Sequence, residues 1–210
     1  MTTDELVLYT NPQSRGRIVR WMLEEVGAPY RVEVLGWGAP MRREDFLAIN
    51  PMGKVPTLVA GGQVITETPA ICAWLADTYP QSRLAPPPGD PGRAAYYRWL
   101  FYAAGPVEAA CTDRTLGVTV PPDKRAMCGY GSFEEMLDVL DDALSVIGAG
   151  WLCGPSFSAA DLYLASQLGF MIQFKVIPPR PVFTEFVARA QGRPAFQRAA
   201  ALDDAAVEAG

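Results

Sequence analysis

The sequence contains no histidine among its 210 residues. Histidine is the usual general base of catalytic triads and the commonest metal ligand in proteins. Its absence excludes histidine-dependent nucleophilic catalysis and histidine-ligated metal centres. Any chemistry of this chain must use hydroxyl, carboxylate, amine or thiol groups, or a reactive group that a bound molecule supplies.

Cysteine is scarce, and its four copies are isolated: Cys72, Cys111, Cys128 and Cys153. No two of them form a Cys-x-x-Cys pair, and their spacing does not fit a zinc site. We therefore expect reduced thiols and no bound metal.

Runs of one kind of residue are also missing. The net charge is −5 and the isoelectric point is near 4.8, and without a basic cluster nucleic acid is not expected as a partner. No apolar stretch approaches the ~20 residues that span a bilayer, and residues 1–5 lack the basic start of a secretory signal. These absences predict a cytoplasmic protein without a membrane partner.

The residues that are present predict a packed α/β domain in the first part of the chain. Half of the chain is hydrophobic and a fifth is charged, which suffices for a core. Short apolar runs alternate with stretches of helical periodicity up to Tyr79, where Pro80 ends the last helix. The pattern predicts the order β-α-β-α-β-β-α.

A proline-rich segment at residues 86–92 marks a domain boundary because it favours neither helix nor strand. The pattern after it is helical throughout. We expect a first domain at residues 1–80, a linker at 81–92 and an all-helical domain at 93–210. Within the helical domain, the residues Ser158 to Asp161 fit a capping box, which predicts a helix beginning at Ala159.

One candidate binding segment surrounds Val55-Pro56, directly before an expected strand. Proline is tolerated at a strand entry, where a cis bond makes a tight turn. Such a turn leaves the backbone N–H and C=O of Val55 free to pair with an extended peptide. The alternative interpretation of Pro56 is an ordinary loop proline.

A second candidate segment is Glu67-Thr68, at the end of a strand and the start of a helix. Helix N-termini present unpaired N–H groups to an anion. Thr68 adds a hydroxyl, and Glu67 can accept hydrogen bonds from an ammonium group. An amino acid, with its carboxylate and amine on one carbon, satisfies all these groups. The alternatives are an N-cap at Thr68 and a solvated glutamate.

Taken together, these segments resemble the cytosolic glutathione S-transferase superfamily, in its bacterial type. Its members carry a strand-entry Val-Pro with a cis proline, and about a dozen residues later an acidic residue followed by Ser or Thr at a helix start. The capping box matches one in the family's helical domain. The resemblance covers nearly the whole chain and implies a thioredoxin-like first domain followed by helices.

The resemblance also implies roles for individual residues in binding glutathione. Val55, beside cis Pro56, pairs with the cysteinyl part, and Glu67 with Thr68 holds the γ-glutamyl end. Lys54 meets the glycyl carboxylate, with Trp37 or Arg42 as other candidates for that end.

The nucleophile in such an enzyme is the thiol of glutathione. A free thiol has a pKa of about 8.5, and one hydrogen bond to a charged group contributes ~1.5–3 kcal/mol, or one to two pKa units. A single hydroxyl therefore suffices to favour the thiolate. Ser14, as in serine-type members, is the first candidate, and Tyr9, as in tyrosine-type members, is the second. Ser14 as an N-cap and Tyr9 as a core aromatic are the alternatives.

An apolar electrophile is expected to bind against the helix that follows the linker, at Tyr102, Gly105 and Pro106. Gly105-Pro106 predicts a kink in that helix, and core packing is the alternative role of all three residues. Most family members are homodimers, so the resemblance implies a homodimer that uses glutathione in conjugation and detoxification, or in reduction or isomerisation. The competing functions are a non-catalytic glutathione-binding or scaffold protein and, disfavoured by the missing cysteines, a disulfide reductase.

Overall fold

The computed structural model describes residues 5–208. The chain forms two compact units. Unit 1 comprises Met1–Ser82 and Arg193–Gly210, and unit 2 comprises Arg83–Gly192. Each unit has its own hydrophobic core, and each is described separately.

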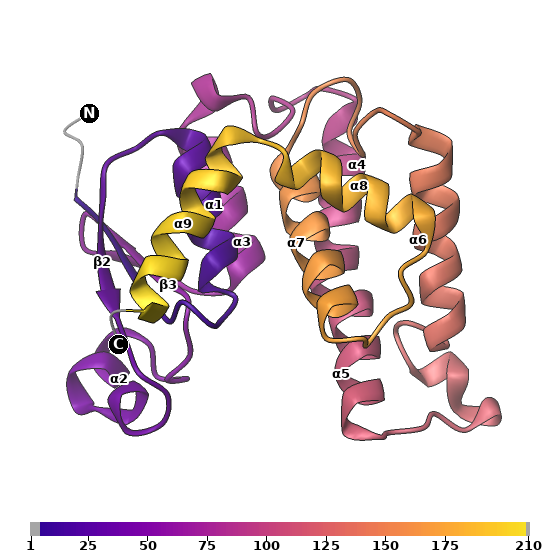
Figure 1. The fold of residues 1–210 in the computed structure, drawn as a ribbon, viewed down its shortest axis with the longest axis horizontal. Helices are drawn as coiled ribbons and strands as arrows, with labels where there is room; N and C mark the ends of the chain where they lie inside the picture. The colour runs from indigo at the N-terminus through magenta and orange to yellow at the C-terminus, as the bar shows by residue number, and fades with distance from the viewer. Residues whose placement is uncertain (1–4, 209–210) are drawn as a thin grey trace. The chain divides into compact units, whose positions relative to one another are not determined.

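Unit 1 is built on a mixed sheet with the strand order β2-β1-β3-β4 (Figure 1). β1 runs parallel to β2 and antiparallel to β3, and β3 runs antiparallel to β4. The strands are β1 (Leu6–Thr10), β2 (Tyr30–Val34), β3 (Thr57–Ala60) and β4 (Gln63–Ile65). Apolar side chains of the two central strands, Leu8 and Leu58 among them, are fully buried, so the sheet forms the core of the unit.

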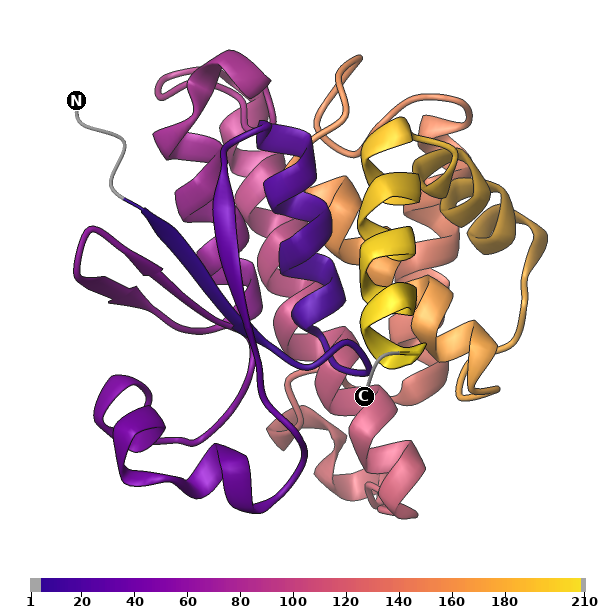
Figure 2. The ribbon, with the colours of Figure 1, turned by 60° about the vertical axis from the view of Figure 1, so that its left-hand side comes forward.

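Helices α1 and α3 lie on the same side of this sheet (Figure 2). The helical elements of the first 82 residues are α1 (Gly16–Val26), η1 (Ala39–Arg42), α2 (Glu44–Ile49), α3 (Thr68–Thr78) and η2 (Pro80–Ser82). Gly27 ends α1 at φ 68°, where its N–H donates to the carbonyl of Leu23, a termination that glycine favours. The predicted order β-α-β-α-β-β-α and the thioredoxin-like fold are confirmed.

The last helix, α9 (Pro194–Glu208), belongs to unit 1 and lies beside α1 (Figures 1 and 2). The ring of Phe196 packs edge-on against Trp21 of α1, with centroids 4.9 Å apart. The helical pattern of the sequence predicts one helical domain over residues 93–210, whereas the compact units place residues 193–210 with the sheet. The boundaries 1–80, 81–92 and 93–210 remain a prediction.

Unit 2 is helical and is centred on α7, which is buried along most of its length. Its elements are α4 (Gly92–Tyr102), η3 (Ala103–Val107), α5 (Glu108–Leu116), η4 (Pro122–Met127), α6 (Phe133–Ile147), α7 (Ala159–Gln173) and α8 (Pro181–Gln191). The predicted irregularity at Gly105-Pro106 is present as the π-helical turn η3 between α4 and α5. The missing N–H of Pro106 prevents a regular helical ladder there.

The predicted capping box is confirmed at the start of α7, which begins at Ala159. The carboxylate of Asp161 accepts hydrogen bonds from the Ser158 backbone N–H at 2.9 Å and from its hydroxyl at 2.6 Å. Across residues 5–208, no helix combines the length and apolar character needed to cross a bilayer.

Candidate functional site

The sheet topology brings the candidate segments of unit 1 to the same end of the sheet, where β1 and β4 end and β3 begins. Tyr9 near the end of β1 pairs with Thr57 at the start of β3, and Ile65 at the end of β4 pairs with Leu58. Three loops meet the strands at this end of the sheet, at residues 11–15, 50–56 and 66–67. The predicted roles of these loops are therefore compatible with a single binding site.

The loop at residues 50–56 has a rigid framework around Val55. The Val55–Pro56 bond is cis, as predicted. The buried side chain of Asn50 donates to the carbonyl of Lys54 at 2.9 Å and to Oγ1 of Thr57 at 3.0 Å. Within residues 5–208, nothing pairs with the backbone N–H or C=O of Val55, so both groups are available to a ligand.

Asn50 shapes the loop around Val55, and its role was not predicted from the sequence. It is only 3% exposed although it lies in a loop. Its Oδ1 also accepts from the backbone N–H of Met52 at 3.1 Å. An Asn-Pro pair between a helix and a strand indicates a turn, and that was the only available signal.

Lys54 follows a glycine that the backbone requires. Gly53 has φ 59°, and a Cβ at this position would lie 2.7 Å from the carbonyl oxygen of Met41. Lys54 itself is exposed and forms no ion pair in the described part of the chain. Arg42 donates to the carbonyl of Met52 at 3.4 Å, and Trp37 is exposed.

Glu67 and Thr68 stand at the N-terminus of α3. Glu67 adopts φ 66° and ψ 113°, an unfavourable conformation for a residue with a side chain, which costs roughly 1–3 kcal/mol and is common at ligand sites. Its exposed carboxylate has no partner among residues 5–208. Thr68 is the first helical residue, so its predicted position as N-cap is wrong by one residue.

The side chain of Thr68 is buried, yet its hydroxyl has no hydrogen-bond partner in the described residues. The N–H groups of the first turn of α3 carry the partial positive charge of a helix N-terminus. The hydroxyl and these amides can together bind a carboxylate.

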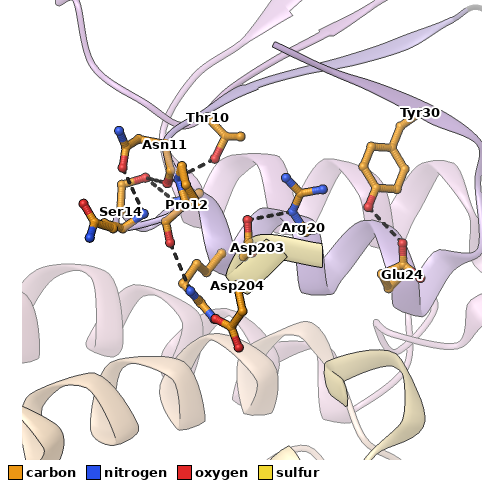
Figure 3. Close-up of polar contacts among 12 residues, drawn as sticks. Thr10, Asn11, Pro12, Ser14, Arg20, Glu24, Tyr30, Asp203 and Asp204 are labelled. Carbon is orange, nitrogen blue, oxygen red and sulfur yellow. Dashed lines mark hydrogen bonds and ion pairs between the residues drawn. The ribbon is translucent and has the colours of Figure 1, made fainter. Parts of the chain in front are cut away.

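The loop at residues 11–15 carries Ser14, the first candidate for the activating hydroxyl (Figure 3). Its Oγ donates to the carbonyl of Asn11 at 2.6 Å and accepts from the backbone N–H of Gly16 at 2.9 Å. α1 begins at Gly16 and Arg15 occupies the N-cap position. The alternative interpretation of Ser14 as the N-cap is therefore wrong by one residue, although its oxygen does bind a helix amide.

Tyr9, the second candidate, lies on the other face of β1 from the residues that meet α1. Its ring packs against Phe46 of α2, with centroids 5.6 Å apart. Adjacent strand residues point to opposite faces. Thr10 therefore faces α1, and a Cβ added to Gly16 in that helix would lie only 1.8 Å from Oγ1 of Thr10. The Tyr9 hydroxyl has no partner among residues 5–208, so both hydroxyls remain candidates.

Three candidate residues of the electrophile site belong to unit 2. Tyr102 donates to the carbonyl of Met136 in α6 at 3.2 Å, and burial raises the pKa of Tyr102. Gly105 is exposed and Pro106 is half-buried in the π-helical turn. Their assignment to a substrate site remains a prediction. Tyr96 of α4 is fully buried, whereas Tyr97 and Phe101 are exposed.

Burial makes three of the cysteines poor nucleophiles. It raises the pKa of Cys72 to about 12 and those of Cys111 and Cys153 to about 11, so these thiols are protonated at neutral pH. In the residues that the structure describes, no cluster of three or more cysteines and acidic residues is placed to hold a metal ion.

Comparison with known proteins identifies the class. Residues 14–78 match the family "Glutathione S-transferase, N-terminal domain". The chain is 31% identical to the glutathione S-transferase GstA of Escherichia coli O157:H7 over 63% of this chain and 65% of that protein. It is 30% identical to the maleylacetoacetate isomerase of Pseudomonas aeruginosa over 91% of this chain and 94% of that protein.

Solved structures agree with these relatives. A glutathione transferase of Methylococcus capsulatus superimposes with a TM-score of 0.79 at 30% identity, covering 95% of this chain and 98% of that one. A sphingomonad glutathione S-transferase in complex with glutathione gives 0.75 at 26% identity, covering 94% and 98%. The chain therefore belongs to the cytosolic glutathione S-transferase superfamily, and it is a glutathione S-transferase.

Proposed function

We propose that unit 1 binds reduced glutathione across the three loops at this end of its sheet. The observation that carries this proposal is the convergence of unpaired groups from loops far apart in the sequence. The backbone of Val55 pairs with the cysteinyl residue of the ligand. Thr68 and the N-terminus of α3 bind the γ-glutamyl carboxylate, and Glu67 accepts from its ammonium group. Lys54, in the same loop as Val55, binds the glycyl carboxylate.

The thiol of the bound glutathione is then activated by a hydroxyl, for which Ser14 is the preferred donor. Ser14 precedes the positive end of α1, and that end favours an anion such as the thiolate. To donate to sulfur, the Ser14 hydroxyl must exchange its hydrogen bond to Asn11 for one to the ligand. Tyr9 is the alternative donor, and its hydroxyl is already unpaired within the described chain.

The thiolate attacks an apolar electrophile and forms a thioether while a leaving group departs; Tyr102, Gly105 and Pro106 are the residues proposed to bind that electrophile. Conjugation is the primary reaction that we propose, with reduction or isomerisation as further outcomes of the same thiolate. Isomerisation has the support of a relative whose name is maleylacetoacetate isomerase. A role in detoxification, a cytoplasmic location, a homodimer and independence of metal complete the proposal.

The test is calorimetric titration with reduced glutathione, followed by thiolate ultraviolet absorbance against pH. We expect saturable binding and a thiol pKa below the ordinary value of about 8.5. Ser14→Ala should leave the Kd within a few-fold and raise the thiol pKa by about one to two units, since it removes a hydrogen bond to a charged group. If Tyr9→Phe raises this pKa and Ser14→Ala does not, the hydroxyl belongs to Tyr9.

One observation favours a second candidate function, glutathione binding without turnover. The Ser14 hydroxyl already donates to Asn11 over a short distance of 2.6 Å, and a hydroxyl that stays so engaged cannot stabilise a thiolate. Binding without any shift of the thiol pKa would identify a carrier or scaffold protein.

A further inference from the structure

We propose that α9 positions the loop that carries Ser14, through Asp204 and Arg17. This inference rests on the proposed function, because the loop matters to catalysis only if Ser14 faces the glutathione sulfur. Asp204 and Arg17 are positioning residues, and neither is proposed to touch the ligand.

Complementary charges fix the register of α9 on α1. Going along α1, two arginines, Arg17 and Arg20, precede two glutamates. Going along α9 from Arg193, the basic residues come first and the acidic residues last. The resulting ion pairs join antiparallel helices: Arg17 with Asp204, Arg20 with Asp203, Glu24 with Arg198, and Glu25 with Arg193. A shift of one helical turn, about four residues, would place Ala199 or Val207 opposite Arg20 and would leave the buried charges of Arg20 and Asp203 unpaired, which is unfavourable.

The buried member of this series anchors the end of α9. Arg20 and Asp203 are 5% and 1% exposed, and Nε of Arg20 lies 2.7 Å from Oδ1 of Asp203 (Figure 3). Breaking a buried pair leaves an uncompensated charge. The Arg20–Asp203 pair therefore holds the neighbouring residue Asp204 close to the start of α1.

Arg17 connects Asp204 to the loop. Its Nη2 lies 2.6 Å from Oδ1 of Asp204, and its Nη1 donates to the carbonyl oxygen of Pro12 at 3.1 Å. Its backbone N–H donates to the carbonyl of Ser14 at 3.2 Å. One arginine thus binds the loop on both sides of Gln13, and Asp204 orients the guanidinium that does so.

The Asn11 end of the loop makes its own hydrogen bonds, which do not involve Arg17 or α9. Asn11 donates through Nδ2 to the carbonyl of Leu35 at 2.8 Å, and its Oδ1 accepts from the N–H of Gln13 at 2.9 Å. Without Arg17, the segment from Pro12 to Ser14 would keep its Asn11 contacts and lose its side-chain contact on the α9 side. A displacement of a catalytic hydroxyl by even ~1 Å weakens its hydrogen bond to the reacting atom.

Because the Arg17–Asp204 pair is exposed, its effect on the loop can be measured without a large effect on the stability of the fold. The side chains of Arg17 and Asp204 are 38% and 64% exposed, and exposed ion pairs contribute only about 0–1 kcal/mol to folding. Removing the pair should therefore change the loop without unfolding the protein. The pair of Arg198 with Glu24 provides a matched control, since Arg198 also binds one carboxylate, at 2.9 Å, and one backbone carbonyl, at 3.1 Å.

The experiment compares Arg17→Gln, Asp204→Asn and the control Arg198→Gln in the full-length protein. Amide hydrogen exchange is measured at Ser14 and Gly16, whose N–H groups donate to Asn11 and to Oγ of Ser14. The thiol pKa of bound glutathione is measured on the same samples. For the first two variants we expect roughly tenfold faster exchange and a thiol pKa raised by about half of the Ser14→Ala effect. Asp204→Glu, which keeps the charge, should behave like the wild type.

Exchange rates in Arg17→Gln and Asp204→Asn equal to those in Arg198→Gln would overturn the proposal. Faster exchange with an unchanged thiol pKa would also overturn it, because the loop would then move without consequence for the thiolate. A wild-type protein that does not bind glutathione would instead disprove the proposed function. In that case amide exchange alone decides whether α9 holds the loop.

Discussion

At the scale of single residues, the candidate site depends on polar groups that the protein leaves unpaired. Thr68 shows this most clearly, because its side chain is buried while its hydroxyl oxygen keeps some solvent contact and has no hydrogen-bond partner among the described residues. A ligand carboxylate beside the helix N-terminus can supply the missing hydrogen bond.

Thr68→Ala should weaken glutathione binding by ~1–3 kcal/mol, or roughly 5- to 150-fold in Kd, through loss of a hydrogen bond to a charged group. Calorimetric titration measures this effect. Thr78→Ala, at the exposed C-terminal end of the same helix, is the control and should bind like the wild type. An unchanged Kd in Thr68→Ala would remove this residue from the site.

Gly16 is the residue that lets α1 start close to β1. A Cβ there would lie 1.8 Å from Oγ1 of the fully buried Thr10 and 3.0 Å from Oγ of Ser14. We expect Gly16→Ala to lower the free energy of unfolding by ~1–3 kcal/mol through overpacking, measured by urea denaturation. Gly105→Ala, where a Cβ meets nothing within 4 Å, should not lower it, because alanine favours a helical backbone over glycine by roughly 0.5–1 kcal/mol. Equal effects of both substitutions would argue against a clash.

At the scale of elements, local signals predicted most of the helices and strands. The apolar periodicity of α1, the Pro80 that ends α3 and the box at Ser158 to Asp161 are short-range features, and each acts where it stands in the sequence. The exact helix starts at Gly16 and Thr68 were missed by one residue, because a serine or threonine near a helix start has nearly equal reasons to precede it or to join it. Whether Ser14 or Tyr9 activates the thiol was not predictable, since it depends on the ligand's position.

The cap of α7 has an expected pH dependence. Asp161 is fully buried, and burial raises its pKa to about 6, well above the ordinary value of an aspartate. A carboxyl whose pKa is higher in the folded state stabilises the fold at low pH, and this contribution is lost as pH rises through about 6. The shift of about two units corresponds to about 2 kcal/mol between pH 4 and pH 7.

Asp161→Asn removes this titration together with part of the cap, because an amide nitrogen cannot accept hydrogen bonds from Ser158. We expect a loss of ~1–3 kcal/mol at pH 7 and a larger deficit relative to the wild type at pH 4. Urea denaturation followed by circular dichroism at both pH values measures the difference. Ser158→Ala, which keeps the carboxyl, should retain the pH dependence of the wild type. A deficit that shrinks on acidification would contradict the raised pKa.

At the scale of the whole molecule, the return of α9 to unit 1 is the feature that the sequence did not reveal. A helical pattern near the C-terminus indicates a helix, but its partner lies some 180 residues away, and nothing local identifies α1 as that partner. The charge order shared by the two helices becomes informative only once they are known to be neighbours. The same holds for Asn50, whose importance comes from contacts with Lys54 and Thr57 that a turn motif does not specify.

The Arg20–Asp203 pair makes this connection between distant parts of the chain testable. We expect Arg20→Met to lower the free energy of unfolding by ~3–5 kcal/mol, because it leaves Asp203 charged and buried. The double variant Arg20→Met with Asp203→Leu should recover most of this loss, since no buried charge remains. Arg198→Gln, which removes a half-exposed arginine from the same interface, should cost at most about 1 kcal/mol, because Glu24 keeps its hydrogen bond from Tyr30. These values come from urea denaturation, and a double variant no more stable than the single one would contradict this account.

The discontinuity of unit 1 also has a consequence for protein synthesis. Residues 1–82 leave the ribosome before the 110 residues of unit 2 are complete, and the synthesis of unit 2 takes roughly 5–20 s at ordinary translation rates. During this interval Arg20 lacks Asp203 and Trp21 lacks Phe196, because both partners belong to the last helix to be translated. The sheet unit must therefore wait in an incomplete form while a later unit is completed, and the chain closes its first-made part with its last-made helix.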